Sequence, residues 1–205
     1  HPQAKPVFDL DSTSLLGIAR WLREEHRFES GRKITFAPRV LLGAAENPNV
    51  SPVEHRAVRL AKKISAGAQF VQTQYCYDIP LLRRFMTAVE DAGLLEQVFI
   101  LIGVGPIRTA KAGEWMRTHV PGIHIPDSVI ERMKGAEDQT REGLNLCVDL
   151  IQEVRTIKGV SGVHVMAYRQ EEAVAEVIDR SGILAGRTPW FPGRDQQINE
   201  DRKLS

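Results

Sequence analysis

Short, uninterrupted apolar segments alternate along this sequence with segments of helical periodicity, and this alternation restricts the fold more than any other feature. The clearest apolar segment, Val98–Val104, is rich in branched side chains and carries no charge. Its continuous apolar character predicts a strand that is buried on both faces, as the strands of parallel sheets are. Because strands that alternate with amphipathic helices form βαβ units, the sequence predicts an α/β fold around a parallel sheet.

The expected elements follow one another in a regular order. Strands are predicted at 40–45, 68–74, 98–104 and 162–167, with a short one at 123–125, and helices at 12–28, 51–67, 81–93, 109–119, from 127, at 141–157 and at 171–181. We expect Ser12 or Ser14 to cap the first helix. At the second helix, Ser51 and Glu54 predict a capping box, with Pro52 at the first helical position.

The length of the chain restricts the architecture further. A closed barrel of eight β/α units usually takes about 250 residues, and this chain has 205. The pattern therefore fits either an open doubly wound sheet or a barrel that lacks its first strands, and periodicity does not separate the two. We expect one domain over residues 1–184, followed by a polar C-terminal extension over residues 185–205.

Composition argues against several classes of function. The net charge of +1 gives no attraction to nucleic acid or to a membrane surface. No apolar run reaches the roughly 18 residues of a spanning helix. Cys76 and Cys147 lack a C-x-x-C spacing, so we expect buried thiols in a reducing compartment, the cytoplasm. The six histidines show no ligand spacing, and we expect no metal site.

Ligand sites of parallel α/β proteins lie at the carboxyl ends of the strands, so the candidate residues are sought there. Gly43–Pro48 ends the first predicted strand with small residues and offers the amide of Asn47. Gln74 ends the second strand, just before Tyr75 and Tyr77, a combination that suits a planar heterocycle. The alternatives, a turn that needs small residues and a strand end with core aromatics, stay open.

A basic stripe runs along one predicted helix, where Arg56, Arg59, Lys62 and Lys63 recur at spacings of three to four. Such a stripe either holds phosphates or is simply solvated. The segment Gly103–Arg108 resembles a glycine-rich phosphate turn but lacks its third glycine. The residues by themselves display no catalytic acid or base.

Four segments together resemble the methylenetetrahydrofolate reductase family, in the family's order and at its spacing. They are Gly43–Pro48, Arg59–Ala68, Thr73–Asp78 and Gly103–Pro106. The resemblance covers roughly residues 1–184. It implies an eight-stranded (β/α)8 barrel, a TIM barrel of the methylenetetrahydrofolate reductase type, present here as an incomplete barrel that lacks its first strands.

The resemblance also implies an activity, the flavin-dependent reduction of 5,10-methylenetetrahydrofolate to 5-methyltetrahydrofolate in one-carbon metabolism. The implied cofactor is FAD, with FMN as the alternative, and NADH, NADPH or a partner subunit supplies the electrons. The implied substrate is a folate. We expect a homo-oligomer or a hetero-complex, including one with the missing N-terminal part of the barrel.

Site residues follow from the resemblance by position. It implies cofactor contacts for Phe8, Asp9, Asn47, Arg59, Lys62, Lys63, Gln74 and Met166, and substrate contacts for Gln74, Tyr77 and Gln170. The catalytic residues stay unknown, because the family's general acid and its flavin-tuning aspartate would precede residue 1.

Two departures from the family keep a second interpretation open. Ala110 stands where some members have a folate-stacking phenylalanine, and Gln170 stands where some have an arginine that faces the substrate. In this second interpretation, the chain is a non-redox subunit that binds a folate or a methyl group within a larger complex. A third interpretation is an unrelated α/β binding module.

Overall fold

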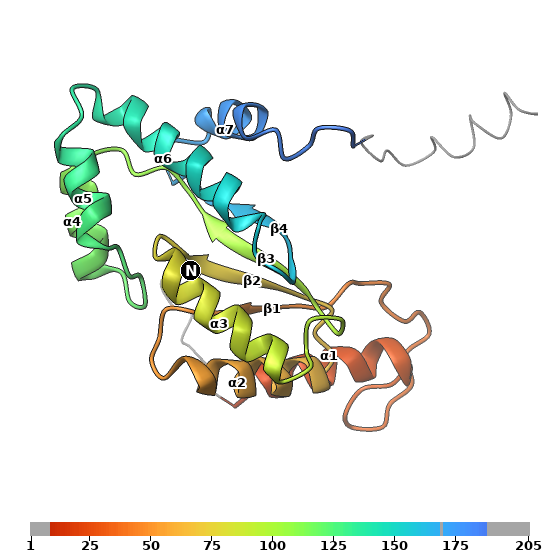
Figure 1. Ribbon diagram of the computed structural model, residues 1–205. Helices are drawn as coiled ribbons and strands as arrows, with labels where there is room; N and C mark the ends of the chain where they lie inside the picture. Colours follow the sequence, from red (N-terminus) through yellow and green to blue (C-terminus); the bar gives the residue numbers. More distant parts are fainter. Residues whose placement is uncertain (1–8, 169, 188–205) are drawn as a thin grey trace, which may run out of the picture.

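The computed structural model describes residues 9–168 and 170–187 (Figure 1). Within this part, the strands are β1 (Gly43–Glu46), β2 (Phe70–Tyr75), β3 (Phe99–Val104) and β4 (Val160–Val165). The helices are α1 (Ser12–Glu24), α2 (Val53–Ser65), α3 (Ile79–Asp91), α4 (Ala110–His119), α5 (Asp127–Lys134), α6 (Gln139–Val154) and α7 (Ala173–Ser181). The predicted α/β fold is confirmed, and most elements lie within a few residues of their predicted places.

The four described strands form one parallel sheet in the order β1-β2-β3-β4. The strand order follows the chain order without a reversal, whereas a doubly wound sheet reverses at its switch point. The carboxyl ends of the strands all lie at one edge, because the pairing is parallel throughout. This edge is where the loops after β1, β2, β3 and β4 come together.

The two faces of the sheet differ in what covers them. Ile100, Ile102 and Val104 of β3 are fully buried and belong to a core that includes side chains of α2, α3 and α6. Figure 1 shows these helices along the sheet, and α2 contacts α3, which contacts α6. On the opposite face, Phe99 keeps 64% of its surface exposed and Gln72 is exposed as well. The helices therefore bury one face and leave the other partly open.

The N-terminal ends of α1 and α2 correct two predictions. The cap of α1 is Asp11, whose carboxylate accepts the Ser14 backbone N–H at 2.7 Å, so neither Ser12 nor Ser14 serves as the cap. Helix α2 begins at Val53, and Pro52 occupies the cap position without a side-chain hydrogen bond. The predicted capping box fails because the helix starts one residue later than expected, which leaves the preceding serine outside the cap position.

The short strand predicted at 123–125 is also wrong. His124 makes a single parallel bridge to Cys76, and no ladder continues from it. Ile123 and Ile125 are buried, so their apolar pattern reflects packing in the core.

Three further observations concern the earlier expectations. The two cysteines are free and buried, as predicted. None of the helices in the described residues has the length and apolar character needed to cross a membrane. Residues 188–205 of the expected C-terminal extension lie outside the described part of the chain.

Candidate functional site

A cleft of about 440 Å³ opens at the carboxyl edge of the sheet. Its walls come from the end of β1, from α2, from the end of β2 and from the residues in and after β4. Because ligands of parallel α/β proteins bind at this edge, the cleft is the candidate site.

Five of the residues to which the family resemblance assigns contacts meet in this cleft, together with Arg56 of the basic stripe. Asn47, Arg59, Lys63, Gln74 and Met166 all line it. They are separated by up to 119 positions in the chain, and the parallel sheet brings them together by aligning the strand ends. Their individual roles stay predictions.

Other predicted site residues lie elsewhere. Phe8 falls outside the described residues, and Asp9 and Lys62 are exposed and do not line the cleft. Gln170 donates from Nε2 to the carbonyl of Pro106 at 3.4 Å, also away from the cleft lining.

Tyr77 is a core residue in this structure. Only 3% of its surface is exposed, its hydroxyl donates to the Gly105 carbonyl at 3.1 Å, and its ring stacks on Tyr75 with centroids 5.6 Å apart. Burial raises the pKa of Tyr77 well above its ordinary value of 10.0. The structure thus places Tyr77 beneath the strand ends and not among the cleft-lining residues.

Glu46, which the sequence analysis missed, is the most buried charge of the cleft. It is the last residue of β1, and its side chain is 2% exposed. One carboxylate oxygen accepts from the Lys63 ammonium at 2.7 Å, and the other accepts from the Asn47 backbone N–H at 3.0 Å. The Lys63 ammonium also donates to the Ala45 carbonyl. Lys63 of the basic stripe is therefore buried in a salt bridge and not solvated.

Two nitrogen atoms of the cleft are buried without a hydrogen-bond partner among the described residues. They are Nε of Arg56 and Nδ1 of His164, and both side chains line the cleft. Buried polar atoms in native structures are normally paired. Unpaired nitrogen atoms on the α2 wall and the β4 wall therefore point to hydrogen-bond partners that a ligand or a further segment of protein would provide.

Amide side chains connect the loops at the carboxyl edge. Asn47 donates to the Gly122 carbonyl at 3.0 Å, and Asn49 donates to the same carbonyl at 3.1 Å. Asn49 also donates to the Tyr75 carbonyl at 2.8 Å. The loop after β1, the end of β2 and the loop between α4 and α5 are thus held together.

The glycines at the end of β3 have a steric explanation. A Cβ on Gly105 would lie 2.0 Å from the Met166 carbonyl oxygen, and one on Gly103 would lie 2.4 Å from the Thr73 carbonyl oxygen. Met166 also accepts a hydrogen bond from the Tyr75 hydroxyl at 2.9 Å. The glycines let neighbouring strand ends approach closely, which accounts for the segment that resembles a phosphate turn.

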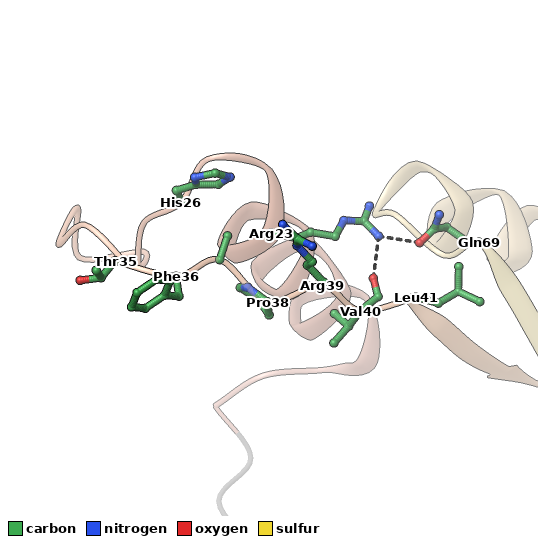
Figure 2. Close-up of a pocket in the computed structure, with 10 residues that line it drawn as sticks. Arg23, His26, Thr35, Phe36, Pro38, Arg39, Val40, Leu41 and Gln69 are labelled. Atoms are coloured by element: carbon green, nitrogen blue, oxygen red, sulfur yellow. Dashed lines mark hydrogen bonds between the residues drawn. The ribbon is translucent and has the colours of Figure 1, made fainter. Parts of the chain in front are cut away.

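A second cavity, of about 520 Å³, lies at the opposite, amino-terminal end of the sheet (Figure 2). Its walls include Phe36, Val40 and Leu41, which belong to the segment that connects α1 to β1. Arg23 donates to the Val40 carbonyl at 3.2 Å and to the Gln69 side chain at 2.5 Å, as Figure 2 shows. None of the predicted site residues lines this cavity, and the amino-terminal end of such a sheet is usually devoted to stability.

In the described part of the chain, no group of three or more His, Cys, Asp or Glu side chains is arranged to hold a metal ion.

The fold and the cleft define a parallel α/β protein with a cleft at the carboxyl ends of its strands, lined by cationic and amide side chains. The family model for methylenetetrahydrofolate reductase matches residues 13–182. The chain belongs to the methylenetetrahydrofolate reductase family.

Curated relatives agree with this assignment. Methylenetetrahydrofolate reductase 2 of Schizosaccharomyces pombe is 28% identical over 153 residues, which cover 71% of this chain and 23% of that protein. Methylenetetrahydrofolate reductase 2 of Saccharomyces cerevisiae is 28% identical over 163 residues, with coverage of 74% and 26%. The 5,10-methylenetetrahydrofolate reductase of Escherichia coli is 24% identical over 153 residues, with coverage of 71% and 50%. The chain therefore matches half or less of the length of these relatives.

A solved structure is similar in fold. It is an uncharacterized protein from Clostridium thermocellum that binds two copies of 5-methyl-5,6,7,8-tetrahydrofolic acid. The TM-score is 0.52 at 18% identity, and the match covers 86% of this chain and 63% of that one.

Proposed function

We propose that this chain is a sector of a β/α barrel that binds a flavin at its carboxyl strand ends and takes part in reducing 5,10-methylenetetrahydrofolate to 5-methyltetrahydrofolate. One observation carries the proposal. Five of the residues to which the family resemblance assigns contacts line a single cleft, and they come from the loop after β1, from α2, from β2 and from the residue after β4: Asn47, Arg59, Lys63, Gln74 and Met166. Family membership supports the same folate chemistry.

The barrel sector accounts for the shape of the sheet. Four sequential parallel strands with helices on one face have the arrangement of neighbouring units in a β/α barrel. The other face carries exposed Phe99 and half-buried Phe70 and Leu101, which in a closed barrel would lie inside it. The chain's short match to its relatives supports the idea that further strands complete the barrel.

The cleft residues fit a flavin in size and in chemistry. A volume of about 440 Å³ lies in the usual range of small-molecule pockets. Cationic side chains on α2 suit a phosphate and ribityl chain, and the Gln74 amide suits the polar edge of a ring. The unpaired Nδ1 of His164 and Nε of Arg56 are further groups that a polar ligand would satisfy. FAD is the first candidate and FMN the second.

When bound, the flavin would supply hydride transfer to the folate, after reduction by NADH, NADPH or a partner subunit. The residues of this chain would bind and orient the reactants. Gln74 accepts the Tyr75 backbone N–H at 3.0 Å through Oε1, which fixes the amide and leaves Nε2 to donate to a ligand. Glu46 is held in its salt bridge, so we place the proton donor outside these residues.

The second candidate is a non-redox folate- or methyl-group-binding subunit. Ala110 is buried, and its backbone N–H donates to the Gln139 side chain at 2.8 Å, so no aromatic side chain stacks on a substrate from this position. The similar structure from Clostridium thermocellum, with its two bound copies of 5-methyl-5,6,7,8-tetrahydrofolic acid, agrees with either candidate, because the reductase reaction yields the same compound.

The visible absorption spectrum of the purified protein, before and after incubation with FAD or FMN, tests the proposal. Flavin bands that stay with the protein through gel filtration are the expected result. Binding of 5-methyltetrahydrofolate without any flavin would favour the second candidate, and binding of neither would reject both.

A substitution then tests the site itself. Gln74→Ala is expected to lower methylenetetrahydrofolate turnover by about tenfold or more, because a positioned hydrogen bond to the substrate is lost. The melting temperature is expected to stay near that of the parent protein. Gln97→Ala is the matched control, because this exposed amide donates to the Gly93 carbonyl at the far end of the sheet. A turnover loss shared by both variants would count against the assignment of Gln74.

A further inference from the structure

The three cationic side chains that line the cleft differ in how many of their N–H donors already have a partner. Lys63 is 9% exposed, and two of its three ammonium donors are taken by Glu46 and by the Ala45 carbonyl. Arg59 is exposed at the rim. The salt bridge thus leaves Lys63 little capacity to neutralise a ligand anion.

Arg56 is the cation with unused capacity. Its side chain is 16% exposed, and its nearest carboxylate oxygen, on Glu46, lies 3.9 Å from NH1, beyond hydrogen-bond distance. Its Nε is buried and has no partner among the described residues. The buried Nε is thus desolvated without the hydrogen bond that usually compensates.

Glu46 explains why the unpaired cation is Arg56. Its carboxylate oxygens already accept from the Lys63 ammonium and from the Asn47 backbone N–H, both at shorter distances than the contact to Arg56. Arg56 is therefore attracted to the carboxylate without being tied to it. Its planar group, with five N–H donors, matches the oxygens of a phosphate or carboxylate better than an ammonium does.

We propose that Arg56 recognises an anionic group of the ligand in this cleft, and that Glu46 is the positioning residue that holds Lys63 and leaves Arg56 for that role. The anion is an oxyanion of the phosphate or carboxylate type. In the function proposed above, on which this inference rests, it comes either from the flavin phosphate or from the glutamate carboxylates of the folate.

Ligand pairs that differ by one anionic group test the inference and separate the two sources. Dissociation constants are measured for FMN against riboflavin by flavin fluorescence, and for 5-methyltetrahydrofolate against 5-methyltetrahydropteroate by calorimetry. The proteins are the parent chain, Arg56→Gln, Arg56→Lys, Glu46→Gln and the control Arg84→Gln. Arg84 is an exposed arginine of α3, and its substitution changes the net charge equally.

For one pair, Arg56→Gln is expected to weaken binding of the anionic member by about tenfold or more, because charge-assisted hydrogen bonds are lost. The partner with one anionic group fewer is expected to lose less affinity: this is riboflavin, which lacks the phosphate, or the pteroate, which has one carboxylate where the glutamate conjugate has two. Arg56→Lys keeps the charge without the planar group and should fall between the two, which separates recognition from a folding defect. Glu46→Gln frees Lys63 and should tighten binding of the anionic member and steepen its salt dependence. Arg84→Gln should change neither pair.

The outcomes distinguish the source and the failure. Loss confined to FMN assigns Arg56 to the flavin phosphate, and loss confined to the glutamate-bearing folate assigns it to the substrate. Failure of both flavins to bind the parent chain would reject the proposed redox function, while the folate pair would still test Arg56. Equal weakening of both members in both pairs would overturn the inference, as would a parent chain that binds the two members of each pair equally well.

Discussion

The buried pair of Glu46 and Lys63 allows a quantitative prediction about stability. The two side chains are 2% and 9% exposed, and their charged atoms lie 2.7 Å apart. Removing one member of such a pair leaves the other charge buried without its partner, which typically costs about 3–5 kcal/mol. We therefore expect Lys63→Met to lower the free energy of unfolding by several kcal/mol.

The neighbouring Arg56 sets where in that range the cost falls. In Lys63→Met its guanidinium can close the 3.9 Å gap to Glu46 and recover part of the lost pairing. We expect a loss of about 3 kcal/mol for Lys63→Met, near the lower end of the range. Glu46→Leu should cost a similar amount, because the Lys63 ammonium keeps the Ala45 carbonyl but no counter-charge.

A double-mutant cycle measured by urea denaturation checks this reasoning. The double variant Glu46→Leu/Lys63→Met replaces both charges with apolar groups and should cost clearly less than the sum of the single changes, with a coupling of about 2 kcal/mol or more. Lys62→Met is the control, since this neighbouring lysine is exposed and should change stability by no more than about 0.5 kcal/mol. Additive single changes, or a loss at Lys63 no larger than at Lys62, would refute the description of a buried pair.

Two further predictions concern the strand ends and the core thiols. Gly105→Ala should lower the free energy of unfolding by about 3 kcal/mol, because the added methyl would lie 2.0 Å from a backbone oxygen. Gly17→Ala, at a position on α1 with open space around it, should raise the free energy of unfolding by up to about 1 kcal/mol. Similar effects of the two changes in urea titrations would contradict this. Burial raises the pKa of Cys76 and of Cys147 from 9.0 to about 12. The folded chain therefore holds protons that the unfolded chain releases, so the thiol contribution to stability should be complete below about pH 8.5 and should decline as the pH rises towards 12. Urea titrations between pH 8 and pH 11 measure this decline, and an equal decline in a chain with both cysteines replaced by alanine would assign it to other groups.

The sequence was sufficient for the fold class and for the approximate place of most elements. The strand predicted at 98–104 is found at Phe99–Val104. The predicted burial on both faces holds for one face only, because Ile100, Ile102 and Val104 are buried whereas Phe99 on the other face is 64% exposed. The first strand, predicted at 40–45, begins three residues later, at Gly43. Val40 and Leu41 are apolar but 47% and 63% exposed, because they belong to the connecting segment before β1. An apolar side chain is therefore a good predictor of burial only where its segment pairs with a neighbouring strand or packs against a helix.

The site could be predicted in part, for a similar reason. Parallel strands must end at one edge, so Asn47 and Gln74 could be expected to lie near each other from their places in the pattern alone. The state of Lys63 could not be predicted in this way. Whether that lysine is solvated or buried depends on Glu46, which lies 17 positions earlier on another element and reaches it through the folded sheet. A carboxylate at a strand end, followed by a basic helix, is the signal that would have found the pair.

The amide contacts of Asn47 and Asn49 have a consequence for how the cleft meets a ligand. Both side chains converge on the Gly122 carbonyl, and Asn49 also holds the end of β2, so the loops that border the cleft are already tied before anything binds. A ligand that enters this edge has little loop motion to freeze. The conformational entropy lost on binding should therefore be small, and selectivity should arise from rigid complementarity instead of closure around the ligand.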